Sequence, residues 1–231
     1  MEEFGKVIAI EPWLQTVVIG GGAGYFFVKK KNDETTKVPA TLAPAPAPKG
    51  SLLVESDPPS GVALEPAAGI GRFVGACRAR PELAGLRWVA VEYSRISAEI
   101  CRLLYPEAEV HNAPFEKWLV EHYEQYAGQL ALVVTNPPYG VRGGNKTIDP
   151  DKSYREDVAY VYFIRRPFDM LRAGGIGVAI VPRGFLSGTG PAAVRARASV
   201  LRRHHLICAY RLPSDIYPGA EIVTDVSFWR A

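Results

Sequence analysis

The chain has 231 residues, enough for one well-packed domain, and a globular composition with 48% hydrophobic and 22% charged residues. Wholesale disorder is therefore excluded. The net charge of +3 is compatible with a polyanionic partner but does not establish one. The three cysteines, Cys77, Cys101 and Cys208, form no CxxC pair, and the four histidines do not cluster with them. We therefore expect no metal site, and free thiols that suit the reducing cytoplasm.

The N-terminal fifty residues differ from the rest of the chain. An almost uninterrupted apolar run at residues 13–28 is followed by three lysines, and an Ala-Pro tract at residues 39–48 predicts a semi-rigid linker. Two interpretations of the apolar run remain open. It is either a membrane anchor, although short for a span of about 20 residues, or an apolar appendage that packs on the domain or on a partner. A dinucleotide-binding turn is disfavoured, because Tyr25 stands where that pattern requires a small residue.

These features divide the chain into an N-terminal segment with its linker, residues 1–50, and a folded domain, residues 51–231. We predict that removal of residues 1–50 leaves a domain with a cooperative thermal transition, because the linker isolates the segment. Aggregation of the truncated protein, or loss of that transition in a thermal melt, would show that the segment belongs to the core.

From residue 51 onward, short apolar runs alternate with helical patterns, which is typical of an α/β fold with a parallel sheet. We expect strands at residues 62–65, 87–92, 109–111, 130–135, 176–181, 206–212 and 222–229, the last two as an antiparallel pair. We expect helices at residues 71–80, 94–105, 115–126, 158–171 and 192–203. Gly174 and Gly175 are expected to close the helix that ends at residue 171.

The first predicted strand runs into a turn with two glycines, Glu65-Pro-Ala-Ala-Gly-Ile-Gly71. Open α/β sheets bind ligands at this end of their strands, and Gly69 and Gly71 allow a ligand to approach the backbone closely. The carboxylate of Glu65 would attract an ammonium group and repel a phosphate. The turn therefore favours a ligand other than a nucleotide phosphate.

A second acidic residue, Glu92, ends the next predicted strand about 20 residues after the glycines, a spacing that recurs in nucleoside-binding folds. A carboxylate at that place can accept hydrogen bonds from both hydroxyls of a ribose. Together, the glycine turn and Glu92 indicate a site for a nucleoside cofactor.

The fourth predicted strand ends in Asn136-Pro137-Pro138-Tyr139. The amide oxygen of Asn136 and the carbonyl oxygen of Pro137 can accept hydrogen bonds from a planar amine, and a proline has no N–H group to compete. The ring of Tyr139 offers a face on which a base flipped out of a duplex can stack. A turn that merely ends a strand would explain the prolines but not the flanking asparagine and tyrosine.

With these motifs, the sequence resembles adenine-N6 DNA methyltransferases in which the cofactor motif precedes the Asn-Pro-Pro-Tyr motif. The resemblance covers residues 62–229 and implies a Rossmann-like, S-adenosylmethionine-dependent methyltransferase fold, a mostly parallel seven-stranded sheet with helices on both faces. It implies direct in-line methyl transfer to the N6 amine of a flipped adenine in DNA, with residues 51–231 as the catalytic domain. The implied catalytic residues are Asn136, Pro137, Pro138 and Tyr139. The implied cofactor-binding residues are Glu65, Pro66, Ala67, Gly69, Gly71, Glu92, Asn112, Phe115 and Asn136.

The sequence departs from the family's pattern in three places. The acid that usually reaches the cofactor's adenine is missing, and Asn112 and Ala113 are the candidates in its place. The helix that usually precedes the cofactor turn is replaced by the Ala-Pro linker. No target-recognition domain follows Ala231, so we expect sequence choice to come from a separate specificity subunit or a missing extension, or specificity to be low.

Three other functions share the Asn-Pro-Pro-Tyr motif or its fold: methylation of RNA, methylation of a protein glutamine, and a non-catalytic methyltransferase-like subunit. Glu65-Pro66 favours DNA, because the RNA and glutamine enzymes typically have Asp there.

The loop at residues 141–155 carries four basic residues beside the expected base pocket. These residues are Arg142, Lys146, Lys152 and Arg155. They either clamp phosphates or belong to a solvated loop, and the sequence does not decide between the two interpretations.

Overall fold

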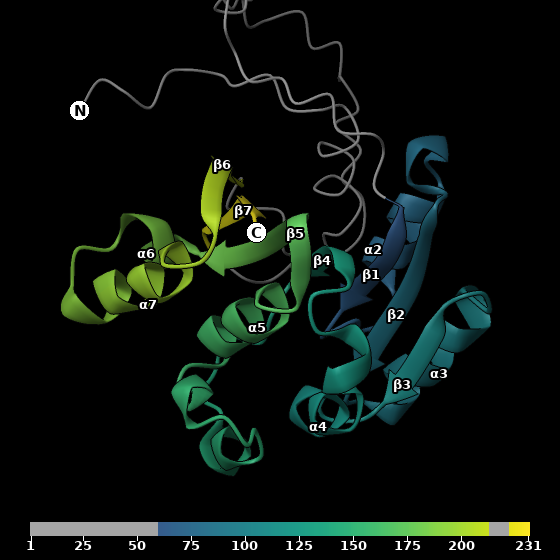
Figure 1. Cartoon of the computed structure of the whole chain (residues 1–231), viewed down its shortest axis with the longest axis horizontal. Coiled ribbons are helices and arrows are strands. Elements are labelled where there is room, and N and C mark those ends of the chain that lie inside the picture. Colours follow the sequence, from purple (N-terminus) through teal and green to yellow (C-terminus); the bar gives the residue numbers. More distant parts are fainter. Residues whose placement is uncertain (1–59, 213–221) are drawn as a thin grey trace, which may run out of the picture.

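The computed structural model describes residues 60–212 and 222–231, which form one seven-stranded sheet in the order β3-β2-β1-β4-β5-β7-β6 (Figure 1). The first five strands in the chain are parallel, and β7 is antiparallel to both β5 and β6. The strands are β1 (Gly61–Glu65), β2 (Leu86–Glu92), β3 (Glu109–Asn112), β4 (Leu130–Thr135), β5 (Leu171–Pro182), β6 (His205–Arg211) and β7 (Thr224–Arg230).

Six α-helices and three short 3-10 turns connect the strands in the described part of the chain. The helices are α2 (Arg72–Arg78), α3 (Arg95–Leu104), α4 (Phe115–Tyr126), α5 (Ala159–Phe168), α6 (Arg183–Ser187) and α7 (Pro191–Leu201). The 3-10 turns are η1 (Pro81–Leu83), η2 (Gly143–Thr147) and η3 (Lys152–Tyr154). The predicted apolar segment and linker lie outside the described residues. Within those residues, no helix combines the length and apolarity that a bilayer span requires.

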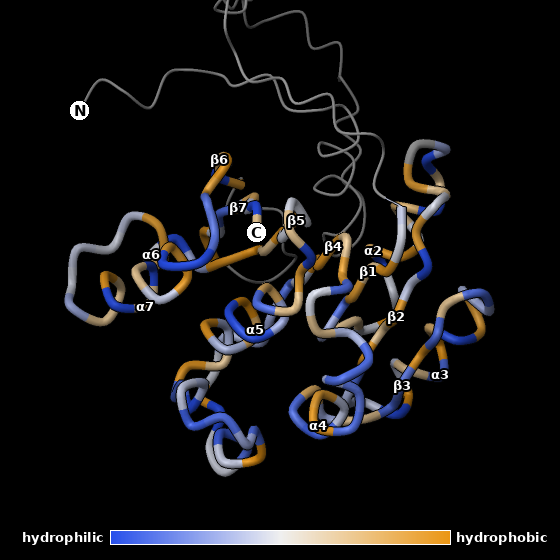
Figure 2. Tube along the Cα trace, viewed as in Figure 1, coloured by the Kyte–Doolittle hydropathy of each residue, from blue (hydrophilic) through white to orange (hydrophobic). Residues whose placement is uncertain are grey.

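Both faces of the sheet are covered, because alternate side chains of each central strand enter different hydrophobic clusters. On β4, Val133 packs into a cluster with residues of α4 and α5, whereas Leu132 and Val134 pack into another with residues of α2. All six residues of β4 are buried, and Figure 2 shows the centre of the sheet as mostly hydrophobic. This burial on two faces explains why the sequence of β4 is an almost continuous apolar run.

The predicted elements agree with the structure except around α5 and β5. The helix ends at Phe168, and β5 begins at Leu171 instead of residue 176. Gly174 and Gly175 therefore do not close a helix. They lie inside β5, where Gly174 donates a backbone hydrogen bond to Ala231 and Gly175 accepts one from it. A Cβ atom at Gly175 would lie 2.9 Å from the carbonyl oxygen of Leu130, so the glycine is required by close strand contact.

Gly71 precedes α2 with a φ of 79°, a conformation that other residues adopt at a cost. A Cβ atom there would lie 2.6 Å from Sγ of Cys101 and 2.8 Å from the ring of Tyr105. The absence of a side chain at Gly71 thus lets the start of α2 pack directly against α3.

We predict that Gly71→Ala lowers the free energy of unfolding by about 2–4 kcal/mol, because backbone strain and steric overlap add. Gly184→Ala in α6 is the matched control, since no atom lies within 4 Å of a Cβ placed there. The control should change stability by less than about 1 kcal/mol. Equal denaturation midpoints for the two variants in urea would contradict the packing role of Gly71.

Candidate functional site

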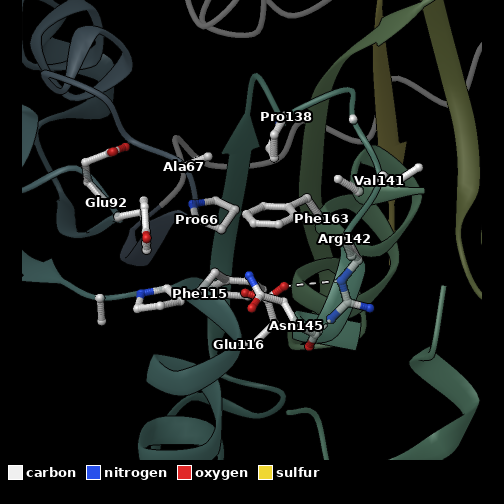
Figure 3. A pocket seen from close by; sticks show the side chains of 15 residues that line it. Pro66, Ala67, Glu92, Phe115, Glu116, Pro138, Val141, Arg142, Asn145 and Phe163 are labelled. Carbon is white, nitrogen blue, oxygen red and sulfur yellow. Dashed lines mark hydrogen bonds and ion pairs between the residues drawn. The ribbon is translucent and has the colours of Figure 1, made fainter. Parts of the chain in front are cut away.

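A pocket of about 350 Å³ lies at the carboxyl ends of the parallel strands (Figure 3). Segments that follow β1, β2, β3 and β4 all contribute to it, as does one face of α5. This is the edge at which open parallel sheets bind ligands. The lining residues are Pro66, Ala67, Glu92, Tyr93, Ala113, Pro114, Phe115, Glu116, Pro138, Gly140, Val141, Arg142, Asn145, Ala159 and Phe163.

The carboxylate of Glu92 is held in the pocket by two backbone N–H groups. Gly69 donates to Oε2 and Ser94 donates to Oε1, each over 2.7 Å. Each carboxylate oxygen can accept a further hydrogen bond, so Glu92 is oriented and still available to a pair of hydroxyl groups. Gly69, predicted to contact a cofactor, therefore also positions the acid predicted to bind the ribose.

Asn112 and Phe115 were both predicted to contact the cofactor's adenine, and the structure separates them. The Asn112 amide donates to the carbonyl oxygens of Glu92 and Tyr93, over 2.9 and 3.0 Å, and its side chain is not part of the pocket. It joins the ends of β2 and β3. Phe115 lines the pocket, and its ring centroid lies 5.3 Å from that of Phe163. The two rings therefore form an apolar part of the pocket wall, and Figure 3 shows Phe163 beside Pro66.

Glu65 is buried at the end of β1, with 2% of its surface exposed. Burial raises the pKa of this carboxyl well above its ordinary value, although a hydrogen bond from the backbone of Val74 opposes that shift. Its Oε2 has no hydrogen-bond partner among the described residues. An unpartnered carboxylate oxygen at this depth is costly, and an incoming cation would offset the cost.

The Asn-Pro-Pro-Tyr segment follows β4, with Pro138 lining the pocket. The hydroxyl of Tyr139 donates to Oδ1 of Asn136 over 3.1 Å and lies 3.5 Å from the carbonyl oxygen of Ile180. Tyr139 therefore has a hydroxyl function that the stacking argument from the sequence did not include: it orients the asparagine amide. The amide oxygen retains a second lone pair for another donor.

An aromatic residue that the sequence analysis missed, Tyr160, stands beside this segment. Tyr160 packs edge-on against Tyr139, with ring centroids 6.3 Å apart, and against Phe185, at 5.8 Å. An aromatic residue near the start of an apolar helix looks like any core residue, so no sequence signal distinguished Tyr160.

Arg142 was one of four candidates for a phosphate clamp, and the structure gives it a different role. Its guanidinium is buried, donates to Glu116 over 3.2 Å and to the carbonyl oxygens of Tyr154, Glu156 and Asn145, and lies 3.4 Å over the ring of Tyr162. Arg142 thus fixes the loop to α4 and α5, and its side chain is only 1% exposed. Of the other three basic residues, Lys146 pairs with Asp157, and two are exposed: Lys152 and Arg155.

We predict that the stability of the ligand-free protein falls as the pH rises above about 4.5, the ordinary pKa of a glutamate, because of Glu65. The unfolded chain ionises this carboxyl first, whereas the folded chain holds the proton to a higher pH, so deprotonation favours unfolding. Glu65→Gln should remove this part of the dependence of stability on pH and raise the melting temperature at pH 7 to 8. Melting curves between pH 4 and 8 test this, with Glu99→Gln on the exposed surface as control. An unchanged slope in the Glu65 variant would refute the assignment.

Comparison with known proteins places the chain among methyltransferases. A family model described as the Eco57I restriction-modification methylase matches residues 91–216. The chain is also 33% identical over 172 residues to the "defense against restriction protein B" of Escherichia phage P1. That match covers 74% of this chain but 7% of the phage protein, so the chain spans a small part of that relative's length.

Solved structures confirm the predicted fold. The type I restriction-modification methyltransferase subunit from Streptococcus thermophilus is similar with a TM-score of 0.62 and 19% identity, over 77% of this chain and 41% of that one. The type IIG restriction endonuclease BpuSI is similar with a TM-score of 0.57 and 18% identity, over 74% of this chain and 22% of that one. A protein from Listeria monocytogenes described as a class I S-adenosylmethionine-dependent methyltransferase is similar with a TM-score of 0.61 and 13% identity, over 75% of this chain and 54% of that one. The fold is therefore that of S-adenosylmethionine-dependent methyltransferases. The resemblance found in the sequence is confirmed: the chain belongs to the Eco57I restriction-modification methylase family.

Proposed function

We propose that this chain forms the catalytic core of a DNA methyltransferase that transfers a methyl group from S-adenosylmethionine to the N6 amine of adenine. The observation that carries the proposal is the Asn136–Tyr139 hydrogen bond at the end of β4, beside the pocket of Glu92. It presents an oriented amide oxygen and an aromatic ring at one place. Membership in a restriction-modification methylase family supports DNA as the substrate.

The described residues fit the cofactor at two chemically distinct groups. The unpartnered, buried Oε2 of Glu65 suits the ammonium group of the methionine part. The backbone-held carboxylate of Glu92 suits the two ribose hydroxyls. When bound, S-adenosylmethionine supplies an electrophilic methyl group on a sulfonium.

The side chains after β4 act on the target amine. Its lone pair is delocalised into the adenine ring, which makes it a poor nucleophile. Asn136 Oδ1 and the Pro137 carbonyl oxygen accept its two N–H groups and favour the geometry in which the lone pair is localised. The nitrogen then takes the methyl group and releases one proton to solvent. Catalysis on this account comes from positioning and electrostatics, without a covalent intermediate.

The partner in this proposal is DNA with the target adenine flipped out of the duplex, stacked on the ring of Tyr139. Sequence choice would come from a separate specificity subunit or a further region of a longer protein. The small share of the phage relative that this chain spans is consistent with such a region. A membrane tether is not part of the proposal.

Substrate class is tested by labelled-methyl transfer from S-adenosylmethionine to DNA, RNA and a protein with an accessible glutamine, run side by side. The proposal expects label in adenine of DNA. Label in RNA or protein with none in DNA would overturn the substrate and leave the fold and family intact. No transfer despite tight cofactor binding would favour the non-catalytic subunit.

We predict that Asn136→Ala lowers methyl transfer by about a hundredfold or more, because one preorganised polar partner of the reacting centre is lost. Cofactor affinity, measured by calorimetry, should stay near that of the wild type, since the side chain faces the target amine.

For Tyr139 the structure changes the expectation, because the sequence alone predicts that Tyr139→Phe retains most activity. Loss of the hydroxyl that orients Asn136 should lower kcat by about fivefold to tenfold, the worth of one neutral hydrogen bond. Tyr160→Phe is the matched control, since it also removes one hydroxyl but retains the ring beside Tyr139. Full activity of Tyr139→Phe would show that only the ring matters.

A further inference from the structure

Glu116 lines the pocket from the first turn of α4 and was not identified from the sequence. Its residue is 3% exposed, and Oε1 accepts from Nε of Arg142 over 3.2 Å. Its other oxygen, Oε2, makes no hydrogen bond to the described part of the chain, and this oxygen is not completely buried. Glu116 therefore offers the pocket one hydrogen-bond acceptor.

Arg142 holds that acceptor in place. All of its contacts, to Glu116, to three carbonyl oxygens and to the ring of Tyr162, lie within the protein. A carboxylate fixed by such a donor has a defined orientation. The acceptor is consequently preorganised for a ligand that donates a hydrogen bond.

The chemistry of the pocket indicates which ligand group that is. Its walls include Phe115, Phe163 and Pro138, which suit a planar ring, and its carboxylates are Glu92 and Glu116. Glu92 is the acceptor proposed for the ribose hydroxyls. Figure 3 shows Glu116 beside Phe115, near Asn145 and Arg142, with Glu92 at the opposite end of the pocket. A nucleobase attached to a ribose at Glu92 would direct its edge toward Glu116.

We propose that Glu116 recognises the nucleobase of the cofactor by accepting a hydrogen bond from the exocyclic amine of its adenine. The proposal rests on the proposed cofactor and assigns to Glu116 the recognition that the sequence placed at Asn112. Glu116 is thus a specificity-determining residue that excludes a nucleoside with a carbonyl oxygen at the same ring position.

Calorimetry on the full chain tests this with S-adenosylhomocysteine and its deaminated analogue S-inosylhomocysteine. The wild type should bind the adenosine form about tenfold or more tightly, because a carboxylate attracts an amine and repels a carbonyl oxygen. In Glu116→Gln the amide oxygen should face Arg142 and the NH₂ group the pocket. The preference should then fall by about tenfold or invert.

Glu121→Gln is the matched control, because Glu121 is an exposed carboxylate of the same helix and does not line the pocket. The preference of this variant for the adenosine form should equal that of the wild type, even if its melting temperature falls. If Glu116→Gln does not fold, Glu116→Gln with Arg142→Met removes both buried charges and should likewise abolish the preference.

Equal binding of the two forms by the wild type, or an unchanged preference in the Glu116 variant, would overturn this inference and leave the proposed function standing. Failure of the folded wild type to bind either form at millimolar concentration would overturn both.

Discussion

The carboxylate of Glu92 connects the ends of the first two strands through backbone hydrogen bonds from Gly69 and Ser94. The turn after β1, the end of β2 and the start of α3 are thereby fixed relative to one another. Asn112 extends this arrangement to β3 by binding the carbonyl oxygens beside Glu92. The pocket is consequently bordered by backbone groups that parallel strands bring to one edge of the sheet.

The other half of the site depends on two buried arginine–carboxylate pairs. Arg142 binds Glu116, and Arg166 binds Asp149, which also accepts from Tyr162. Together they attach the loop after the Asn-Pro-Pro-Tyr segment to α4 and α5. Pairs of this kind contribute little net stability against apolar replacements, but loss of one partner is costly. Their role here is to define a geometry, since the loop supplies one wall of the pocket.

Sequence periodicity was sufficient for most of the fold, because buried parallel strands and amphipathic helices differ in their patterns. It failed at Gly174 and Gly175, where a helix stop and a close strand contact require the same residue type. In the site, the sequence predicted Glu92 and the Asn-Pro-Pro-Tyr segment from their places at strand ends, and Glu92 and Pro138 line the pocket. It could not identify Glu116 or assign Arg142, because the ion pair joins residues 26 apart and charged residues in sequence look solvated.

The burial of the Arg142–Glu116 pair has a consequence for the dependence on ionic strength. Salt screens exposed charges over about 8–10 Å but hardly affects a pair enclosed by protein. The shape of the pocket should therefore persist at salt concentrations that release a polyanion from surface lysines and arginines such as Lys152 and Arg155. For an enzyme that acts on nucleic acid, the two substrates would then respond differently to salt. Binding of the small ligand in the pocket would be unchanged, while the nucleic acid would dissociate sooner.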